Sequence, residues 1–506
     1  MPACRLALAL LAAIACGLST GCGSVSSAGL TTPTTSATDI PTPARTARTP
    51  LLDWPEFGLD PQRSDVSEGG TSITAANASH LRRAEVQVPG TIDSSPIYLH
   101  AVTVGGARHN VIFATTTYGR TVAVDADSAR TLWTFTPSGL GRVSGSAQIT
   151  TASPIADPTH LFIYTASPDG HIHKLSVSDG SEDRKGSWPV SITRDAGHEK
   201  IAAALNIVGG SVIAATGGYL GDAPPYQGHV VLIERAGGRI QRMFNTLCAN
   251  RRELLVPSSC SASNSAILSR DGPVVEPGGK RILIDTGNGP WNGTTDFGDS
   301  VLELNLPGLD LRQSYTPVNQ AQLNGSDSDL GSSAPVLLGG DRVLVAGKDG
   351  VMRVLVLSRL DGHPPSGARA RVHPLGGEVQ RLSIPGGGQL FTAPAVWRAR
   401  RHTTVFLADE NGTAAYVLRA GRLFRAWQNG TSGTSPVMAG GLLYVYDPSA
   451  GAVEVYRPTS GSPIARLASE PGHWNSPIVV DGHVIVPVGN GNDHHTSGKL
   501  EIFSAR

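Results

Sequence analysis

TVAVDADSARTLWTF, at residues 121–135, consists of a β-type run, a turn and a second β-type run. Val, Thr, Trp and Phe favour strands, whereas the Asp and Ser residues between the runs are typical of a tight turn. Working outward, the apolar run at 111–114 precedes this pair, and Ser95-Pro96 opens the unit. Four short strands in succession predict one antiparallel sheet.

Similar units recur along the chain, and each of several begins with a small residue followed by proline. These pairs are Ser95-Pro96, Ser153-Pro154, Ala334-Pro335, Ala393-Pro394, Ser435-Pro436 and Ser476-Pro477. Two more units begin near residues 203–206 and 264–266. An isolated four-stranded sheet exposes both faces, but about eight units of roughly 55 residues packed in a ring would cover one another. The repeat therefore predicts an all-β fold, an eight-bladed β-propeller.

The last unit has three β runs, at 476–480, 483–488 and 499–503, before the sequence ends at Arg506. An early β run at 83–88 precedes the first complete unit and could supply the missing strand. We therefore expect an N-terminal strand to close the ring.

The N-terminus predicts export. Arg5 and the apolar run at 6–18 are typical of a signal peptide, and the run is too short to span a bilayer stably. The run ends in a segment that resembles a bacterial lipobox, with Cys22 as the lipidated residue. We expect a signal peptide at 1–21, a lipidated Cys22 with a flexible Ser/Thr/Pro-rich tether over 22–50, and a single propeller over 51–506. Ordinary signal cleavage, which would make the protein secreted, remains the alternative.

Cys248 and Cys260 are the two cysteines of the predicted propeller. In an oxidising compartment they would form a disulfide, worth about 3 kcal/mol for a loop of this length. Two isolated cysteines lack the paired spacing that a zinc site needs.

The net charge of the chain does not indicate a class of binding partner. Lys+Arg and Asp+Glu both number 41, so the net charge is zero. No overall field would attract nucleic acid. The expected partners are the membrane, through the lipid anchor, and an envelope protein or a small-molecule ligand; we expect a monomer.

Three residues of the opening stretch resemble the tryptophan-docking pattern of the quinoprotein-like β-propellers, a family that includes pyrroloquinoline quinone (PQQ) dehydrogenases and non-catalytic relatives. Ala123, Asp125 and Trp133 match the pattern, while Ser128 and Ala129 replace its usual Thr and Gly. The resemblance implies that the tryptophan lies flat between blades, so the pattern concerns packing and not catalysis.

The same resemblance suggests candidate catalytic residues. In the family's dehydrogenases a calcium ion and PQQ sit over the central channel, and calcium polarises the quinone that accepts the hydride. Asn288 matches the calcium-ligand motif, and Asp327 or Asp329 falls where the catalytic base would lie.

Three departures weigh against this chemistry. No two cysteines are adjacent, although the enzymes place a vicinal pair over the quinone. No Glu at 161–166 matches the calcium carboxylate, and Ser326–Asp329 replaces an Asp-Trp-Asp-like sequence with a polar turn. The leading hypothesis is a non-catalytic envelope propeller that binds a ligand or protein partner, with no cofactor expected. The alternatives are a PQQ- and calcium-dependent oxidoreductase of an alcohol or sugar, and an envelope assembly scaffold.

Overall fold

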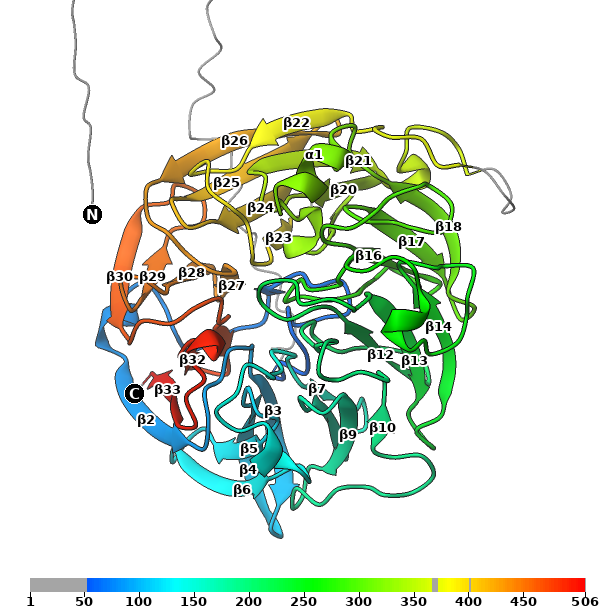
Figure 1. Ribbon diagram of the computed structural model, residues 1–506. Coiled ribbons are helices and arrows are strands. Elements are labelled where there is room, and N and C mark those ends of the chain that lie inside the picture. The colour runs from blue at the N-terminus through cyan, green and yellow to red at the C-terminus, as the bar shows by residue number, and fades with distance from the viewer. Residues whose placement is uncertain (1–51, 366–371, 400–401, 506) are drawn as a thin grey trace, which may run out of the picture. The chain divides into compact units, whose positions relative to one another are not determined.

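Eight antiparallel sheets arranged in a ring make up the described part of the chain (Figure 1). The computed structural model describes residues 52–505 apart from 366–371 and 400–401. The predicted eight-bladed β-propeller is therefore confirmed. The expected signal peptide, Cys22 and the tether over 22–50 lie outside the described residues.

The blades, named in chain order, are meanders whose first strand lies nearest the ring axis (Figure 1). Blades 1 to 4 contain β3 (Ile97–Val104), β4 (Ala107–Thr115), β5 (Thr121–Asp125), β6 (Arg130–Phe135); β7 (Ile155–Ala156), β8 (Phe162–Ala166), β9 (His171–Ser176), β10 (Val190–Ser191); β11 (Asn206–Val208), β12 (Ser211–Thr216), β13 (His229–Glu234), β14 (Ile240–Asn245); β15 (Val274–Val275), β16 (Arg281–Asp285), β17 (Val301–Asn305), β18 (Asp310–Tyr315). Blades 5 to 8 contain β19 (Val336–Gly339), β20 (Arg342–Val345), β21 (Val351–Val356), β22 (Gln380–Ser383); β23 (Ala395–Arg398), β24 (Thr403–Ala408), β25 (Thr413–Arg419), β26 (Arg422–Asn429); β27 (Val437–Ala439), β28 (Leu442–Asp447), β29 (Ala452–Tyr456), β30 (Pro463–Ala468); β31 (Ile478–Val480), β32 (His483–Val488), β33 (Gly498–Ser504), β2 (Arg82–Val88).

Helical structure is confined to short segments in the described residues. The α-helix α1 covers Gln320–Gly325. The 3-10 turns are Ala78–His80, Leu140–Arg142, Pro257–Ser259, Leu330–Ser332, Leu357–Arg359 and Gly491–Asp493. Within the described residues, no helix is long and apolar enough to cross a membrane.

The core consists of apolar layers between neighbouring blades. One layer joins Tyr164 and Ile172 of blade 2 to Val212 and Val231 of blade 3. Because a blade is covered on both faces, its middle strands are buried on both faces, as in β5, where all five residues are buried. The outer strand β6 is partly exposed.

Trp133, in β6, joins blade 1 to blade 2. Its indole N–H donates to the carbonyl of Val177 at 3.0 Å. A Cβ on Gly180 would lie 2.6 Å from the indole ring, so only glycine permits this approach. Trp427 docks on blade 7 in the same way, with its indole N–H on the carbonyl of Pro458 at 2.8 Å.

The turn before Trp133 is held by Asp125. The Asp125 carboxylate accepts hydrogen bonds from the backbone N–H of Ser128 at 2.7 Å and from its hydroxyl at 2.6 Å. Ala129 completes the turn with a φ of 57°, in the left-handed region that favours glycine. Ala123 pairs with Trp133 across β5 and β6.

The ring is closed by β2 and β33. The two strands pair antiparallel from Arg82 opposite Ser504 to Val88 opposite Gly498. The N-terminal strand thus completes blade 8, as the short last unit predicted.

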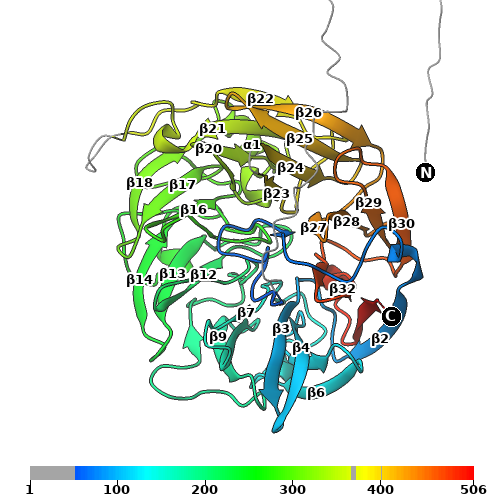
Figure 2. The ribbon, with the colours of Figure 1, turned by 180° about the vertical axis from the view of Figure 1, so that it is seen from behind.

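A segment that precedes β2 crosses the ring axis (Figure 2). This axial segment, residues 53–67, accepts backbone hydrogen bonds of 2.8–2.9 Å from one residue in each of five blades. Each donor stands two positions after a proline at the start of an inner strand: Tyr98, Ala156, Val275, Val396 and Met438. β1 (Val66–Ser67) also pairs with β27 as a fifth strand of that sheet.

Candidate functional site at the ring axis

A second layer of residues lies near the axis, in the loops that lead into the inner strands. These residues stand five positions before the residues that donate to the axial segment. Five residues of extended chain span about 16 Å, so this layer is well separated from the axial segment. In four blades, the residue three positions before the proline of the inner strand is charged or aromatic: Asp93, Arg270, Phe391 and Trp474. We call six residues from these loops the axial cluster: Asp93, Lys200, Arg270, Phe391, His473 and Trp474.

Asp93 and Arg270 make contact across the ring. Asp93 precedes blade 1 and Arg270 precedes blade 4, yet Nη2 of Arg270 lies 3.1 Å from Oδ1 of Asp93. Nη1 of Arg270 also donates to the backbone carbonyl of Asp93. Two loops of non-adjacent blades can touch in this way only near the axis.

One oxygen of the Asp93 carboxylate, Oδ2, is shared by two groups. His473 Nδ1 lies 2.8 Å from Oδ2, and the backbone N–H of Gly491 donates to the same oxygen at 2.9 Å. Burial by itself would raise the pKa of Asp93, but Arg270, His473 and this N–H together hold it well below its ordinary value. Asp93 is therefore ionised over the physiological pH range.

An aromatic stack lies beside this pair. Trp474 stacks on Phe391 with ring centroids 4.2 Å apart and on His473 with centroids 3.9 Å apart. The Arg270 guanidinium carbon lies 5.4 Å from the centre of the Trp474 ring, within cation–π range. All three stacked rings are partly exposed.

Lys200 brings a second cation to the cluster. Burial, and then the nearby charge of Arg270, lower the pKa of Lys200 to about 7, although Asp93 opposes the shift. Its backbone pairs with Gly217, but in the described structure no residue forms a hydrogen bond or ion pair with its ammonium group.

The structure brings together Asn288 and Asp329, two of the residues predicted from the sequence. The backbone N–H of Asn288 donates to Oδ1 of Asp329 at 2.6 Å. The other oxygen of Asp329 pairs with Nζ of Lys348, and Oδ1 of Asp327 lies 3.3 Å from the same nitrogen. Asp329 is buried, whereas the side chain of Asp327 is 65% exposed.

The remaining contacts of this group fix the Asn288 side chain. Its Nδ2 donates to Oδ2 of Asp222 at 2.9 Å, and the Tyr226 hydroxyl donates to the other oxygen at 2.6 Å. Burial raises the pKa of Asp329, and Lys348 partly offsets that shift.

These residues do not fit the calcium and PQQ of the family's dehydrogenases. Calcium takes six to eight oxygen ligands. Here the Asp329 carboxylate is already paired with the Lys348 ammonium group, and the Asp222 carboxylate already accepts from Asn288 and Tyr226. The quinone would also lack its vicinal cysteine wall.

The predicted disulfide between Cys248 and Cys260 is confirmed. It closes a loop that follows β14, and the backbone N–H of Cys248 donates to Asp296 at 3.1 Å. Since its cysteines are 12 positions apart, it is not the adjacent pair of the quinone enzymes.

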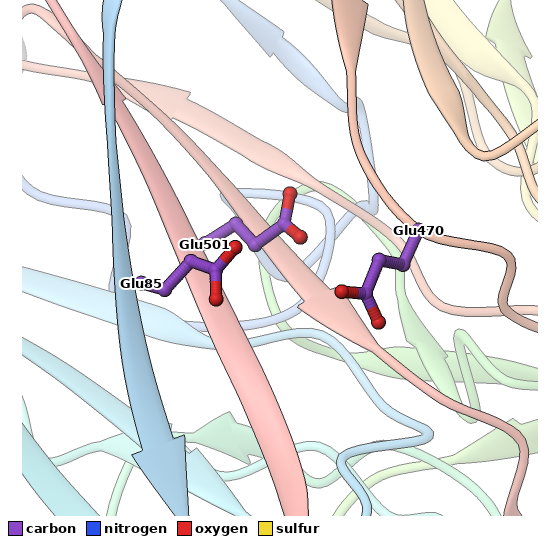
Figure 3. A group of neighbouring side chains, drawn as sticks. All are labelled: Glu85, Glu470 and Glu501. Carbon is purple, nitrogen blue, oxygen red and sulfur yellow. The ribbon is translucent and has the colours of Figure 1, made fainter.

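Glu85, Glu470 and Glu501 form the one group of three potential metal ligands among the described residues (Figure 3). Arg83 bridges Glu85 and Glu501 at 2.7 and 2.6 Å, and Lys499 pairs with Glu470. Because each of the three carboxylates is already paired with Arg83 or Lys499, we interpret the group as a polar network at the ring closure.

Sequence reasoning missed Lys200, Arg270 and Trp474. A signal was present for two of them, since Arg270 and Trp474 each stand three residues before a blade proline. Aligning the units on that proline would have shown that this position carries a charged or aromatic side chain in four blades. Lys200 has no such marker, because its blade lacks the proline.

Comparisons with known proteins agree with this fold. Residues 78–186 match a family model described as outer membrane protein assembly factor BamB. A comparison with curated protein sequences found no match.

Solved structures resemble the chain over most of its length. Quinohemoprotein alcohol dehydrogenase from Comamonas testosteroni superposes with a TM-score of 0.62 at 15% identity, covering 90% of this chain and 81% of that one. Quinohemoprotein alcohol dehydrogenase ADHIIG from Pseudomonas putida HK5 gives 0.64 at 14%, covering 90% and 80%. A europium-containing methanol dehydrogenase gives 0.63 at 14%, covering 90% and 98%. At these identities the likeness shows the fold: the chain has the fold of the quinoprotein-like β-propellers.

Proposed function

We propose that the protein is an exported, lipid-anchored and non-catalytic propeller that binds a ligand or a protein partner with its axial cluster. The ion pair between Lys348 and Asp329 carries the non-catalytic part. A catalytic base must be free to take a proton from substrate, and a calcium ion must be able to approach. Asp329 is instead paired with the Lys348 ammonium group.

The axial cluster supports the binding part of the proposal. Loops that lead into blades 1, 3, 4, 6 and 8 supply its six residues, so one ligand could contact several blades at once. Partly exposed aromatic rings beside charged groups are typical of ligand sites.

A quinoprotein oxidoreductase acting on an alcohol or sugar is the second candidate. The hydrogen bond between Asn288 and Asp329 favours it, because the two residues predicted for metal and base lie together. It requires Lys348 to leave Asp329 when calcium and PQQ bind. The scaffold alternative is supported by the match of residues 78–186 alone.

Reconstitution with PQQ and calcium separates the first two candidates. We expect the purified propeller to show no dye-linked oxidation of alcohols or sugars, and Lys348→Ala to remain inactive. Turnover by the wild-type protein that disappears in Asp329→Asn and Asn288→Ala would overturn the proposal.

Anchoring is tested separately in intact cells. Cys22→Ala should release the protein from membranes, with Cys248→Ser as a matched cysteine control that stays bound. Retention of the Cys22→Ala protein would contradict lipidation at this residue. Crosslinking in intact envelopes tests for a protein partner, and recovery of none would contradict the scaffold alternative.

A further inference from the structure

The blades form two distinct faces of the ring. Because consecutive strands of a blade are antiparallel, the turn between its first and second strands and the turn between its third and fourth strands lie at the same end of the sheet. We call the surface made by these turns the turn face. The axial cluster lies in loops that lead into the first strands, which are at the opposite end.

The described chain begins on the turn face. The carboxylate of Asp53 accepts a hydrogen bond of 2.7 Å from the backbone N–H of His100. It also lies 3.7 Å from the ring of His160, in the turn between the first and second strands of blade 2. The segment that carries the expected lipid at Cys22 therefore joins the propeller on this face.

Arginines gather on the turn face of blades 5 and 6. Arg342 follows the turn between β19 and β20, and its side chain donates at 3.1 Å to the carbonyl of Gly421, in the turn between β25 and β26. Arg398, at the end of β23, lies beside Gly339 and donates to the carbonyl of Leu337. The two blades thus bring these guanidinium groups to one turn.

Three more arginines lie around the same turn. Arg419 and Arg422 stand opposite each other at the two ends of the turn between β25 and β26. Arg359 follows Ser358, whose backbone N–H and hydroxyl both donate to Asp341 in the turn between β19 and β20. We call the five residues the arginine patch: Arg342, Arg359, Arg398, Arg419 and Arg422.

Little negative charge balances the arginine patch. Two carboxylates lie near it: Asp341, whose oxygens accept from Ser358, and Asp60, within electrostatic range of Arg398. In the part of the chain that the structure describes, no ion pair with a carboxylate is formed by four members: Arg342, Arg359, Arg398 and Arg422. The last three of these are exposed. A local excess of positive charge attracts anions even though the whole chain has no net charge.

We propose that the turn face docks on the membrane surface through the arginine patch, with the headgroups of anionic phospholipids as its partners. The guanidinium group suits this role because its donors match phosphate oxygens. Each arginine near an anionic membrane strengthens binding about fivefold. Nucleic acid presents the same phosphate chemistry, but the entry of the chain on this face favours the bilayer.

The inference rests on the proposed lipid anchor and gives that anchor a second contact. An anchor that joins the turn face keeps the arginine patch near the bilayer, so two weak attachments act together. Docking on this face directs the axial cluster away from the bilayer, where a ligand or a protein partner can reach it.

Cosedimentation with vesicles tests the arginine patch without the anchor. The predicted mature chain, residues 22–506, carries Cys22→Ala so that no lipid is attached. At low salt we expect it to bind vesicles that contain phosphatidylglycerol, and to bind vesicles of phosphatidylcholine alone at least tenfold more weakly. Binding should disappear near 1 M salt, where the Debye length is about 3 Å. Equal binding to both kinds of vesicle, or binding to duplex DNA without binding to either, would overturn the inference.

Two matched triple variants test the residues. Replacing three members of the arginine patch by Gln should weaken binding at least tenfold: Arg359→Gln, Arg398→Gln and Arg422→Gln. The control removes three arginines from the opposite face: Arg120→Gln, Arg142→Gln and Arg194→Gln. Arg120 donates to a backbone carbonyl as Arg398 does, and the other two are exposed. Thermal unfolding confirms that both variants fold. Unchanged binding of the folded patch variant, or an equal loss in the control, would overturn the inference.

Orientation on the vesicle provides a second measurement. A fluorophore is attached to Ser358→Cys, on the turn face, or to Glu410→Cys, in the turn between β24 and β25 on the opposite face. Energy transfer to a headgroup-labelled lipid should be stronger from Ser358→Cys, and equal transfer from the two sites would overturn the inference. Lipidation is decided separately by the release of Cys22→Ala from cell membranes, because the arginine patch alone binds weakly at the ionic strength of the cell.

Discussion

Replacing Lys348 by Met tests whether Lys348 and Asp329 form a structural ion pair. The side chain of Asp329 is 3% exposed and that of Lys348 is 18% exposed. Breaking a buried pair by removing one partner costs about 3–5 kcal/mol. Because Lys348 retains some contact with water, we expect Lys348→Met to lower the free energy of unfolding by about 2–4 kcal/mol at pH 7.5.

The effect should depend on pH in a direction that follows from the Asp329 carboxyl group. Burial raises the pKa of Asp329, and loss of Lys348 would raise it further. A carboxyl group whose folded-state pKa is raised contributes most below its unfolded value, and that stability is lost as pH rises through the folded-state pKa. Lys348→Met should therefore differ least from the wild type near pH 5 and most at pH 8.

Urea unfolding at both pH values measures the difference. Asp329→Asn combined with Lys348→Met removes both charges and should recover most of the loss, whereas Lys280→Met changes an exposed lysine and should have little effect. Equal stability of Lys348→Met and wild type at pH 8 would refute the reasoning. A loss that the double variant does not recover would also refute it.

The remaining predictions concern the blades. Replacing Cys248 and Cys260 together by Ser should lower the free energy of unfolding by about 3 kcal/mol in chemical denaturation, and an unchanged midpoint would contradict the disulfide's role. Gly180→Ala should destabilise by roughly 2–3 kcal/mol, because a Cβ would meet an indole ring; Gly209→Ala, with positive φ but open space, should cost only about 1 kcal/mol. Similar losses would argue against the docking contact. Ala129→Gly should raise the melting temperature, since it relieves a left-handed φ worth about 1 kcal/mol; a lower melting temperature would contradict this.

Most of the fold could be predicted from the sequence because the evidence is local and repeated. A proline after a small residue opens an inner strand in unit after unit, and a turn such as that at Asp125 separates two outer strands. The short last unit indicated that a strand from the N-terminus must complete it, and β2 does so. The disulfide could be predicted from two facts: the expected oxidising compartment, and the presence of two cysteines in the propeller.

The axial segment could not be predicted in this way. Residues 53–67 contain hardly any regular structure, and their partners are backbone N–H groups of five inner strands. Such bonds depend on the closed ring and leave no side-chain pattern in the segment itself.

The candidate site was predicted only in part. Asn288 and Asp329 were proposed by resemblance, and the structure places them in hydrogen-bond contact. Lys348 was missed because its role depends on a loop of the next blade. Arg270 was missed for the same reason: its contact with Asp93 joins two loops that are 177 residues apart in the chain.

Calorimetric titration with PQQ, in the presence and absence of calcium, tests the account of the ring axis most directly. Because Asp329 is already paired with Lys348 and the chain has no adjacent cysteines, we expect no calcium-dependent binding of PQQ. Asn288→Ala and Asp329→Asn should leave the titration unchanged. Binding of PQQ that requires calcium and is lost in Asn288→Ala would contradict the account.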